Sequence, residues 1–379
     1  MKRILKAVPF ILVLIILGSG LQPVFGQLAY GSSNSGGLQG KLQSMLEENA
    51  TGYISPFVTG FGEALNSGWF HSAKPHKLLG FDLGVKMMAV AIADENTVFD
   101  FVVPDFSQSI TIDQNSYTVT LVGNELYPDR EVPSIFGEKK TGIIQPAAEA
   151  DIVTMFEQQL LSQGVSQTVL NQSNVQSQLQ TLAAAIPTLA SPPGLGFKYM
   201  PMMVPQAAVG LSIPMTPIHA EIAARYLPEY EISKDIGKIS FLGFGGKLAL
   251  DPFIPIPLFP IDISIGAYMQ KLELGNLLES TSMLYNVQVG KDLNLLVLKV
   301  GVFGAVGLEK TNMKFSYVYA PDNPNDPLYG TEVNFDLDGE NSFRYTLGAR
   351  VQLAVVNVSA AYTHSADDIF TLGAGISIR

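Results

Sequence analysis

The chain has 379 residues, of which 47% are hydrophobic and only 15% are charged. Soluble domains carry roughly 25% charged residues, so this sequence has too few charges for a large solvated surface. The formal net charge of −11 excludes the basic surface that nucleic-acid binding requires. The absence of cysteine excludes disulfide scaffolds and thiolate chemistry.

The N-terminus has the pattern of an export signal. Three basic residues precede an apolar run over residues 7–17, and Val24 and Gly26 stand at the −3 and −1 positions of a cleavage site. This arrangement predicts a cleaved secretory signal peptide over residues 1–26, with an uncleaved membrane anchor as the alternative. We therefore expect a protein exported to the outer membrane of a Gram-negative bacterium.

The rest of the chain is hydrophobic at every second position instead of in continuous runs. Residues 342–355 alternate strictly between apolar side chains and small or polar ones. The same alternation occurs in segments near residues 83–87, 218–226, 261–269, 313–319, 358–362 and 370–378. A soluble β-sandwich also alternates, but it would carry more charge on its polar face. The pattern predicts an all-β fold, a transmembrane antiparallel up-and-down β-barrel of about 12–14 strands over residues 77–379.

Aromatic residues recur near the ends of the predicted strands. In outer-membrane barrels such residues form a girdle at the membrane interface. The candidates are Tyr226, Tyr317, Tyr319, Tyr345, Tyr362 and Phe370.

Three segments depart from the strand pattern. Residues 27–76 are apolar, partly at helical spacing and partly irregular, and we predict that they form a plug in the lumen that includes Phe57, Phe61 and Trp69. A periplasmic cap is the alternative.

The other two segments are predicted loops between strands. Residues 146–190 show apolar residues at helical spacing on both sides of a Gln/Ser/Asn-rich break, which predicts a helical insertion. Residues 320–341 are rich in Asp and Glu and predict an acidic external loop.

Few charged residues occupy the polar faces of the predicted strands. Glu221, Arg225, Arg344 and Arg350 would line the lumen, where the arginines could bind the carboxylate of an amphipathic ligand. In the alternative interpretation these charges pair with one another and brace the barrel.

No known catalytic pattern is present in the sequence. The four histidines do not form a metal-ligand spacing, and neither Gly-x-Ser-x-Gly nor His-Glu-x-x-His occurs. We expect no enzymatic activity, no catalytic residue, no cofactor and no metal.

The stretches at residues 53–81, 205–211 and 224–228 resemble an uncharacterised family of Gram-negative outer-membrane barrels. More remotely, the layout is similar to long-chain fatty-acid channels, which implies a lumen hatch and passage of hydrophobic or amphipathic small molecules. A passive channel of this kind is the predicted function, with outer-membrane lipid and a hydrophobic ligand as partners. A general diffusion porin and a structural or adhesive outer-membrane protein are the alternatives.

Overall fold

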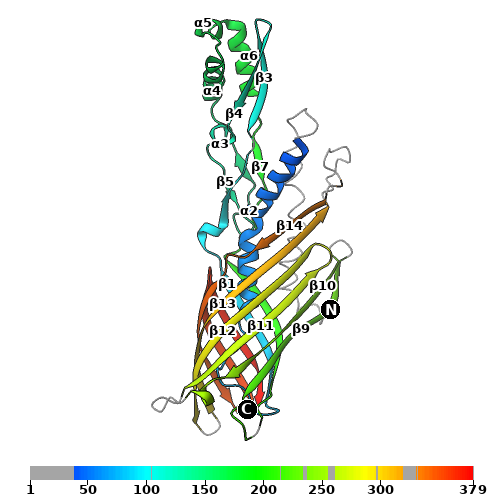
Figure 1. Cartoon of the computed structure of the whole chain (residues 1–379), viewed down its shortest axis with the longest axis vertical. Helices are drawn as coiled ribbons and strands as arrows, with labels where there is room; N and C mark the ends of the chain where they lie inside the picture. Colours follow the sequence, from blue (N-terminus) through cyan, green and yellow to red (C-terminus); the bar gives the residue numbers. More distant parts are fainter. Residues whose placement is uncertain are drawn as a thin grey trace.

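The computed structural model describes residues 38–103, 105–213, 215–233, 237–254, 261–295, 298–318, 330 and 332–378 (Figure 1). The predicted signal peptide, Tyr319 and most of the predicted acidic loop lie outside these residues. Among the described helices, none is long and apolar enough to cross a membrane.

Ten strands of the described chain form a closed antiparallel barrel. They are β1 (Phe81–Ala91), β8 (Tyr199–Gly210), β9 (Ala220–Ser233), β10 (Gly237–Ala249), β11 (Asp262–Leu274), β12 (Leu278–Leu295), β13 (Leu298–Val318), β15 (Phe343–Leu353), β16 (Val356–His364) and β17 (Asp368–Ile378). The ring closes because β1 pairs with β17 and β12 pairs with β13. A shorter strand, β14 (Glu332–Asp338), extends the sheet beside the last part of β13. The prediction of an all-β antiparallel barrel is confirmed.

The strand number is lower than the 12–14 predicted. Two strands are much longer than the 9–11 residues that a spanning strand needs: β12 has 18 residues and β13 has 21. In addition, residues 92–198 lie outside the barrel. Fewer strands therefore account for the same length of chain.

The outer surface of the barrel carries the apolar residues of the alternating segments. Leu347 is 63% exposed, Leu372 56% and Val358 54%, while their neighbours in sequence point inward. Exposure of this kind along every strand is unfavourable in water and favourable in lipid. The fold is thus a β-barrel of the outer-membrane type.

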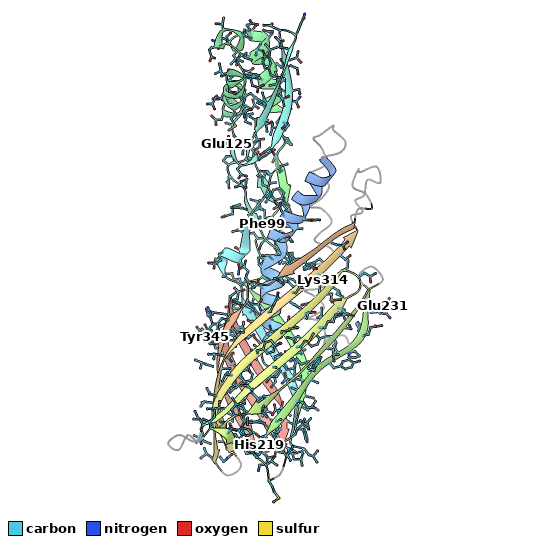
Figure 2. The ribbon with its side chains drawn as sticks, in the orientation of Figure 1. Phe99, Glu125, His219, Glu231, Lys314 and Tyr345 are labelled. Atoms are coloured by element: carbon cyan, nitrogen blue, oxygen red, sulfur yellow. The ribbon has the colours of Figure 1, made fainter. Side chains whose placement is uncertain are left out.

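This pattern reverses toward one end of the barrel. On β13 the outward residues change from Val306 and Leu308 to Lys310 and Lys314, while Phe315 points inward and is buried. The barrel end that carries Lys314 is therefore charged outside and apolar inside, like a soluble domain (Figure 2). We call this end the upper end, and the end near His219 the lower end.

The aromatic girdle is partly visible. Tyr345, Tyr362 and Phe370 pack side by side on the outside of three neighbouring strands, with ring centroids 5.8–6.4 Å apart. Tyr226 is exposed on β9.

A separate lobe, residues 92–198, is inserted between β1 and β8 and projects from the upper end (Figure 1). Its elements are η3 (Asp94–Thr97), β2 (Val98–Asp100), β3 (Phe106–Ile112), β4 (Asn115–Leu121), α3 (Gly123–Leu126), β5 (Glu131–Pro133), β6 (Gly142–Ile144), α4 (Glu149–Ser162), α5 (Gln167–Leu170), α6 (Ser173–Ala184) and β7 (Leu189–Ser191). The insertion is longer than the predicted 146–190, which contains its helices, because short hairpins on both sides of the helices belong to it.

The lobe has its own hydrophobic core. Ile110 and Val119 from the β3–β4 hairpin pack with Phe156 and Leu179 from the helices. Burial raises the pKa of Tyr127 to about 12, so the hydroxyl stays protonated and donates a hydrogen bond to the carbonyl of Pro187 at 2.7 Å. The lobe therefore has the interior of a small soluble domain.

The N-terminal helix α2 (Leu38–Asn66) enters the barrel from the upper end (Figure 1). Its residues Ile54, Phe57 and Phe61 pack against an apolar ring of barrel side chains that includes Met200 and Met313. The segment is thus helical up to Asn66 and irregular after it, as predicted, and Pro56 lies inside the helix. A proline inside a helix removes one backbone hydrogen bond and destabilises the helix. The packing of α2 against the barrel wall offsets this loss.

The seam between β1 and β17 depends on two facing glycines. Gly84 pairs with Gly375, and a Cβ atom at Gly375 would lie 2.5 Å from the carbonyl oxygen of Leu83. We expect Gly375→Val to weaken barrel closure by about 1–3 kcal/mol, as overpacking does. The measurement is the temperature at which the protein loses its folded mobility on a detergent gel. Ala374→Val, whose side chain points outward, is the control and should leave that temperature nearly unchanged.

Candidate functional site

The lumen in the middle and lower parts of the barrel holds the end of α2 and the coil that follows it. This coil runs from Ser67 to Gly80 and leads into β1 at the lower end. We call residues 47–76 the plug. Its contacts with the inward side chains of the barrel define the candidate site.

Arg225 holds the carboxyl end of α2. Alternation on β9 turns Glu221, Ala223 and Arg225 inward. The guanidinium donates hydrogen bonds of 2.6 Å to the carbonyl oxygens of Leu65 and Ser67. These carbonyls end the helix and have no partner within it, so a buried cation satisfies them and also complements the helix dipole.

Trp69 lies against the same guanidinium. The carbon Cζ of Arg225 is 3.9 Å from the centre of the indole, whose other face stacks on Tyr268 at 4.8 Å. Gln206 links the two, since it accepts from Nε of Arg225 and donates to the carbonyl of Trp69. The turn at residues 66–69 is therefore fixed from one side of the barrel.

Arg344 holds the same turn from the opposite side. It donates to Oγ of Ser67 at 2.6 Å and to Oε2 of Glu309 at 2.7 Å. Asn66 donates to the same Glu309 oxygen at 2.8 Å. Both charges of the Arg344–Glu309 pair are almost fully buried, where each charge depends on its partner.

Glu63 connects α2 to an upper loop. Its Oε1 accepts hydrogen bonds from the backbone N–H groups of Ala366 and Asp367 at 2.7 and 3.0 Å. The helix is thus joined to the loop between β16 and β17 as well as to the wall.

The lower part of the plug is held by a second group of ionisable side chains. Nδ1 of His76 lies 2.6 Å from Oε2 of Glu221, and Nε2 lies 3.0 Å from Oγ of Ser377. Lys247 pairs with Glu221 at 3.2 Å and donates to the carbonyl of Ser72. Glu221 therefore serves both the plug and the wall.

Two further charged groups lie at the lower end. Nζ of Lys86 lies 3.3 Å from Nδ1 of His71, and Nε2 of the same histidine lies 3.5 Å from Oδ2 of Asp82. Arg350 pairs with Asp292 at 2.7 Å, a contact between barrel strands. Nε and Nη1 of Arg350 are buried without a hydrogen-bond partner among the described residues.

The predicted site residues are all inside the barrel but do not form one cluster. Arg225 and Arg344 meet at Ser67, Glu221 lies lower beside His76, and Arg350 forms its ion pair with Asp292 of the wall. Phe57, Phe61 and Trp69 are buried, the two phenylalanines in the apolar upper part and Trp69 at the turn. The ligand-binding role of the charged residues stays a prediction.

Several residues of this network were not predicted, notably Glu63, Glu309, Lys247 and His76. Lys247 and Glu309 stand at inward positions of their strands. The alternation of inward and outward residues along each strand could therefore have predicted that both side chains face the lumen. His76 and Glu63 lie on the plug, where no periodicity indicates which side chains meet the wall.

The plug leaves almost no free space around its turn. An interior cavity of about 10 Å³ lies between Ser67, Phe70, Arg344 and Thr346, which is about the volume that one water molecule needs. The turn itself is buried, with Asn66, Ser67 and Trp69 each at most 2% exposed, so the plug and the wall pack tightly at this level.

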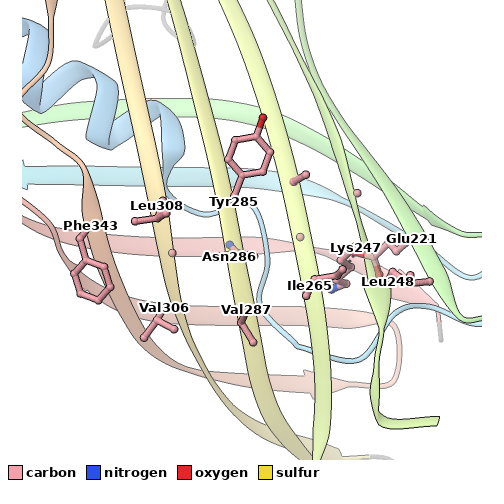
Figure 3. Close-up of a pocket in the computed structure, with 14 residues that line it drawn as sticks. Glu221, Lys247, Leu248, Ile265, Tyr285, Asn286, Val287, Val306, Leu308 and Phe343 are labelled. Atoms are coloured by element: carbon pink, nitrogen blue, oxygen red, sulfur yellow. Dashed lines mark ion pairs between the residues drawn. The ribbon is translucent and has the colours of Figure 1, made fainter. Parts of the chain in front are cut away.

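A larger hollow lies on the outer face of the wall (Figure 3). It measures about 710 Å³. Most of its lining is apolar or small: Leu248, Ile265, Tyr285, Val287, Val306, Leu308 and Phe343 surround Gly246, Gly266, Ala267 and Gly307. Glu221, Lys247 and Asn286 also contribute to the lining. The β12–β13 ladder is continuous here, with Asn286 opposite Gly307, and the exposed side chains Tyr285, Val306 and Leu308 place the hollow on the outer surface of the barrel.

Comparison with known families supports a shared origin over the whole chain. Residues 1–378 match DUF6588, a family of unknown function. The chain belongs to this family. The match agrees with the predicted membership in an uncharacterised family, whereas nothing supports the predicted likeness to fatty-acid channels.

Other comparisons add little to the family assignment. No curated protein sequence matches the chain. Among solved structures, the β-domain of the Bordetella autotransporter BrkA is similar at 14% identity and a TM-score of 0.19. That match covers 47% of this chain and 89% of the other. The assignment of this DUF6588 protein as an antiparallel barrel rests on its own strand pairing.

The environment of Trp69, the only tryptophan in the chain, reports the position of the plug. We expect Arg225→Ala to release the turn at residues 66–69, because two helix carbonyls and the indole lose their buried partner. Acrylamide should then quench the Trp69 fluorescence several-fold more strongly than in the wild type. Arg350→Ala is the control, since the ion pair of Arg350 is with Asp292 of the barrel wall. Equal quenching in all three proteins would contradict the assigned role of Arg225.

Proposed function

We propose that the protein is a closed outer-membrane anchor that presents the lobe, residues 92–198, at the cell surface. The proposed role is non-enzymatic. The observation that carries it is the buried contact between the plug and both walls through Arg225 and Arg344. A lumen closed by such contacts serves as a support and not as an open passage.

The outer surface of the barrel supports insertion in lipid. Exposed apolar side chains cover the lower and middle parts of the strands, and charged ones begin above them. We propose outer-membrane lipid as the partner of this surface, with acyl chains in the hollow of Figure 3.

The position of the lobe supports its exposure to the outside. Outer-membrane barrels have short periplasmic turns and longer extracellular loops. The longest connection of this barrel, residues 92–198, leaves the upper end, whereas residues 354–355 form a tight turn at the lower end. The lobe also has the composition of a domain that lies in water, since it contains twelve acidic and four basic residues besides its hydrophobic core.

The orientation can be tested with single cysteines, because the chain contains none. Ser177→Cys lies on an exposed face of α6, and Asn294→Cys is exposed at the lower end of β12. We expect a membrane-impermeant maleimide to label Ser177→Cys on intact cells, and Asn294→Cys only after the outer membrane is opened. The reverse pattern would contradict surface presentation.

A second candidate function is the predicted passive channel. It is favoured by one observation, the polar wall that faces the plug, which includes Gln206, Ser264, Gln288 and Thr346. A bore lined in this way would hold water if the plug left it. Passage of a hydrophobic or amphipathic molecule would require the same displacement.

Conductance separates the two candidates. As an anchor, the wild-type protein should give no steady conductance in a planar bilayer, and the double variant Arg225→Ala, Arg344→Ala should raise the conductance by loosening the plug. Steady conductance of the wild-type protein would favour the channel. Ala374→Val, which changes only the outer face, is the control.

A further inference from the structure

The β3–β4 hairpin of the lobe has two free edges, of which only one is covered. The hairpin is a separate two-stranded sheet joined by a tight turn at Asp113 and Gln114, both with positive φ. Two side chains of α4 cover the edge of β4. Gln159 donates to the carbonyl of Thr120 at 2.8 Å and accepts from its N–H, and Gln163 donates to the carbonyl of Thr118 at 2.8 Å. These amides take the place of a neighbouring strand.

The same contacts show which backbone groups of β3 point outward. Thr118 and Thr120 direct their backbone groups to α4, so their cross-strand partners Ser109 and Ser107 are not hydrogen-bonded to them. The short contact of 2.9 Å between the hydroxyls of Ser107 and Thr120 fits such a pair. The N–H and C=O groups of Ser107, Ser109 and Thr111 therefore face away from β4.

Nothing in the described chain occupies this edge. The outward backbone groups receive no backbone hydrogen bond, and the one side-chain contact is a long 3.5 Å approach of the Gln108 amide to the carbonyl of Ser109. The strand Phe106–Ile112 contains no charge, no proline and no bulge. Natural proteins protect free edges with these features, because an unprotected edge pairs with other chains.

The charges at the ends of β3 indicate the kind of chain that fits. Asp105 precedes the strand and Asp113 follows it, and no Lys or Arg occurs between Asp100 and Asp129. If a second copy paired antiparallel through all three outward residues, Asp105 would stand opposite Asp113 of that copy. Like charges in opposite positions are destabilising, so self-pairing is disfavoured and a segment with basic ends is favoured.

We infer that the outer edge of β3 binds an extended segment of another protein, which adds a strand to the hairpin and places basic residues near Asp105 and Asp113. Backbone hydrogen bonds would supply the affinity and the two carboxylates the preference for charge. The inference rests on the proposed surface presentation of the lobe for its biological setting, but the binding itself can be measured on the purified protein.

The test uses the full chain in detergent and a fluorescent nine-residue peptide with Lys at both ends and alternating Thr and Val between them. Ser109→Pro removes an outward N–H that the hairpin does not use. We expect it to weaken binding roughly tenfold, while Ser109→Ala binds like the wild type. Equal binding by Ser109→Pro and the wild type, or no binding by the wild type, would overturn the inference.

A second variant keeps the test valid if Ser109→Pro does not fold. Asp113→Asn preserves the turn, since Asn also adopts a positive φ. Together with Asp105→Asn it should reduce binding of the Lys peptide to that of a peptide with Gln ends. An unchanged preference for Lys would overturn the charge assignment, and a wild-type dimer that Ser109→Pro abolishes would assign the edge to a second copy. If Ser177→Cys is labelled on cells but no peptide binds, the strand-addition inference fails and the surface presentation stands. If the peptide binds but Ser177→Cys is not labelled on cells, the surface presentation fails and the inference stands.

Discussion

The closed state of this barrel depends on the clamp that two arginines make on one turn of the chain. Arg225 and Arg344 come from opposite walls and meet at Ser67, where α2 ends. A helix end buried in a barrel needs partners for its free carbonyls, and a buried guanidinium needs acceptors in return. The guanidinium of Arg225 therefore supplies the donors that the carbonyls at the helix end need, and these carbonyls supply its acceptors. Above the clamp the lumen is an apolar core, and below it the coil is held by charged and polar contacts.

The barrel combines two solvent environments along single strands. In lipid the outward positions must be apolar, and in water they must be polar, so a strand that leaves the membrane has to exchange its two faces. On β13 this exchange occurs between Leu308 and Lys310 on the outside, and between Thr311 and Met313 on the inside. The upper barrel with α2 is thus polar outside and apolar inside, and it is continuous with a lower part whose outer surface is apolar, as in outer-membrane-type barrels.

The sequence alone predicted the antiparallel barrel because alternation is a local property of each strand. It did not predict the strand number, since the apolar residues of β13 change face between Leu308 and Met313, so that one long strand contains two separate alternating segments. It also did not show that Met313 and Phe315 face inward, because period two identifies a face but not its solvent. For the lumen, the inward charges Arg225 and Arg344 were found from strand parity. Their partners Leu65 and Ser67 could not be found, because these contacts use backbone carbonyls of a segment that has no strand period.

The path of the plug has a consequence for assembly. The chain descends through the barrel from α2 to Gly80 before the first strand begins, and the ring is closed by β1 and β17, which are almost 300 residues apart (81 and 378). Pairings of such high sequence separation form late in folding. The finished barrel therefore surrounds a segment that precedes all of its strands in the sequence. Removing that segment intact would require either pulling the chain along the bore or reopening the β1–β17 seam. If the clamp blocks the first route, the plug can leave only as fast as the barrel opens.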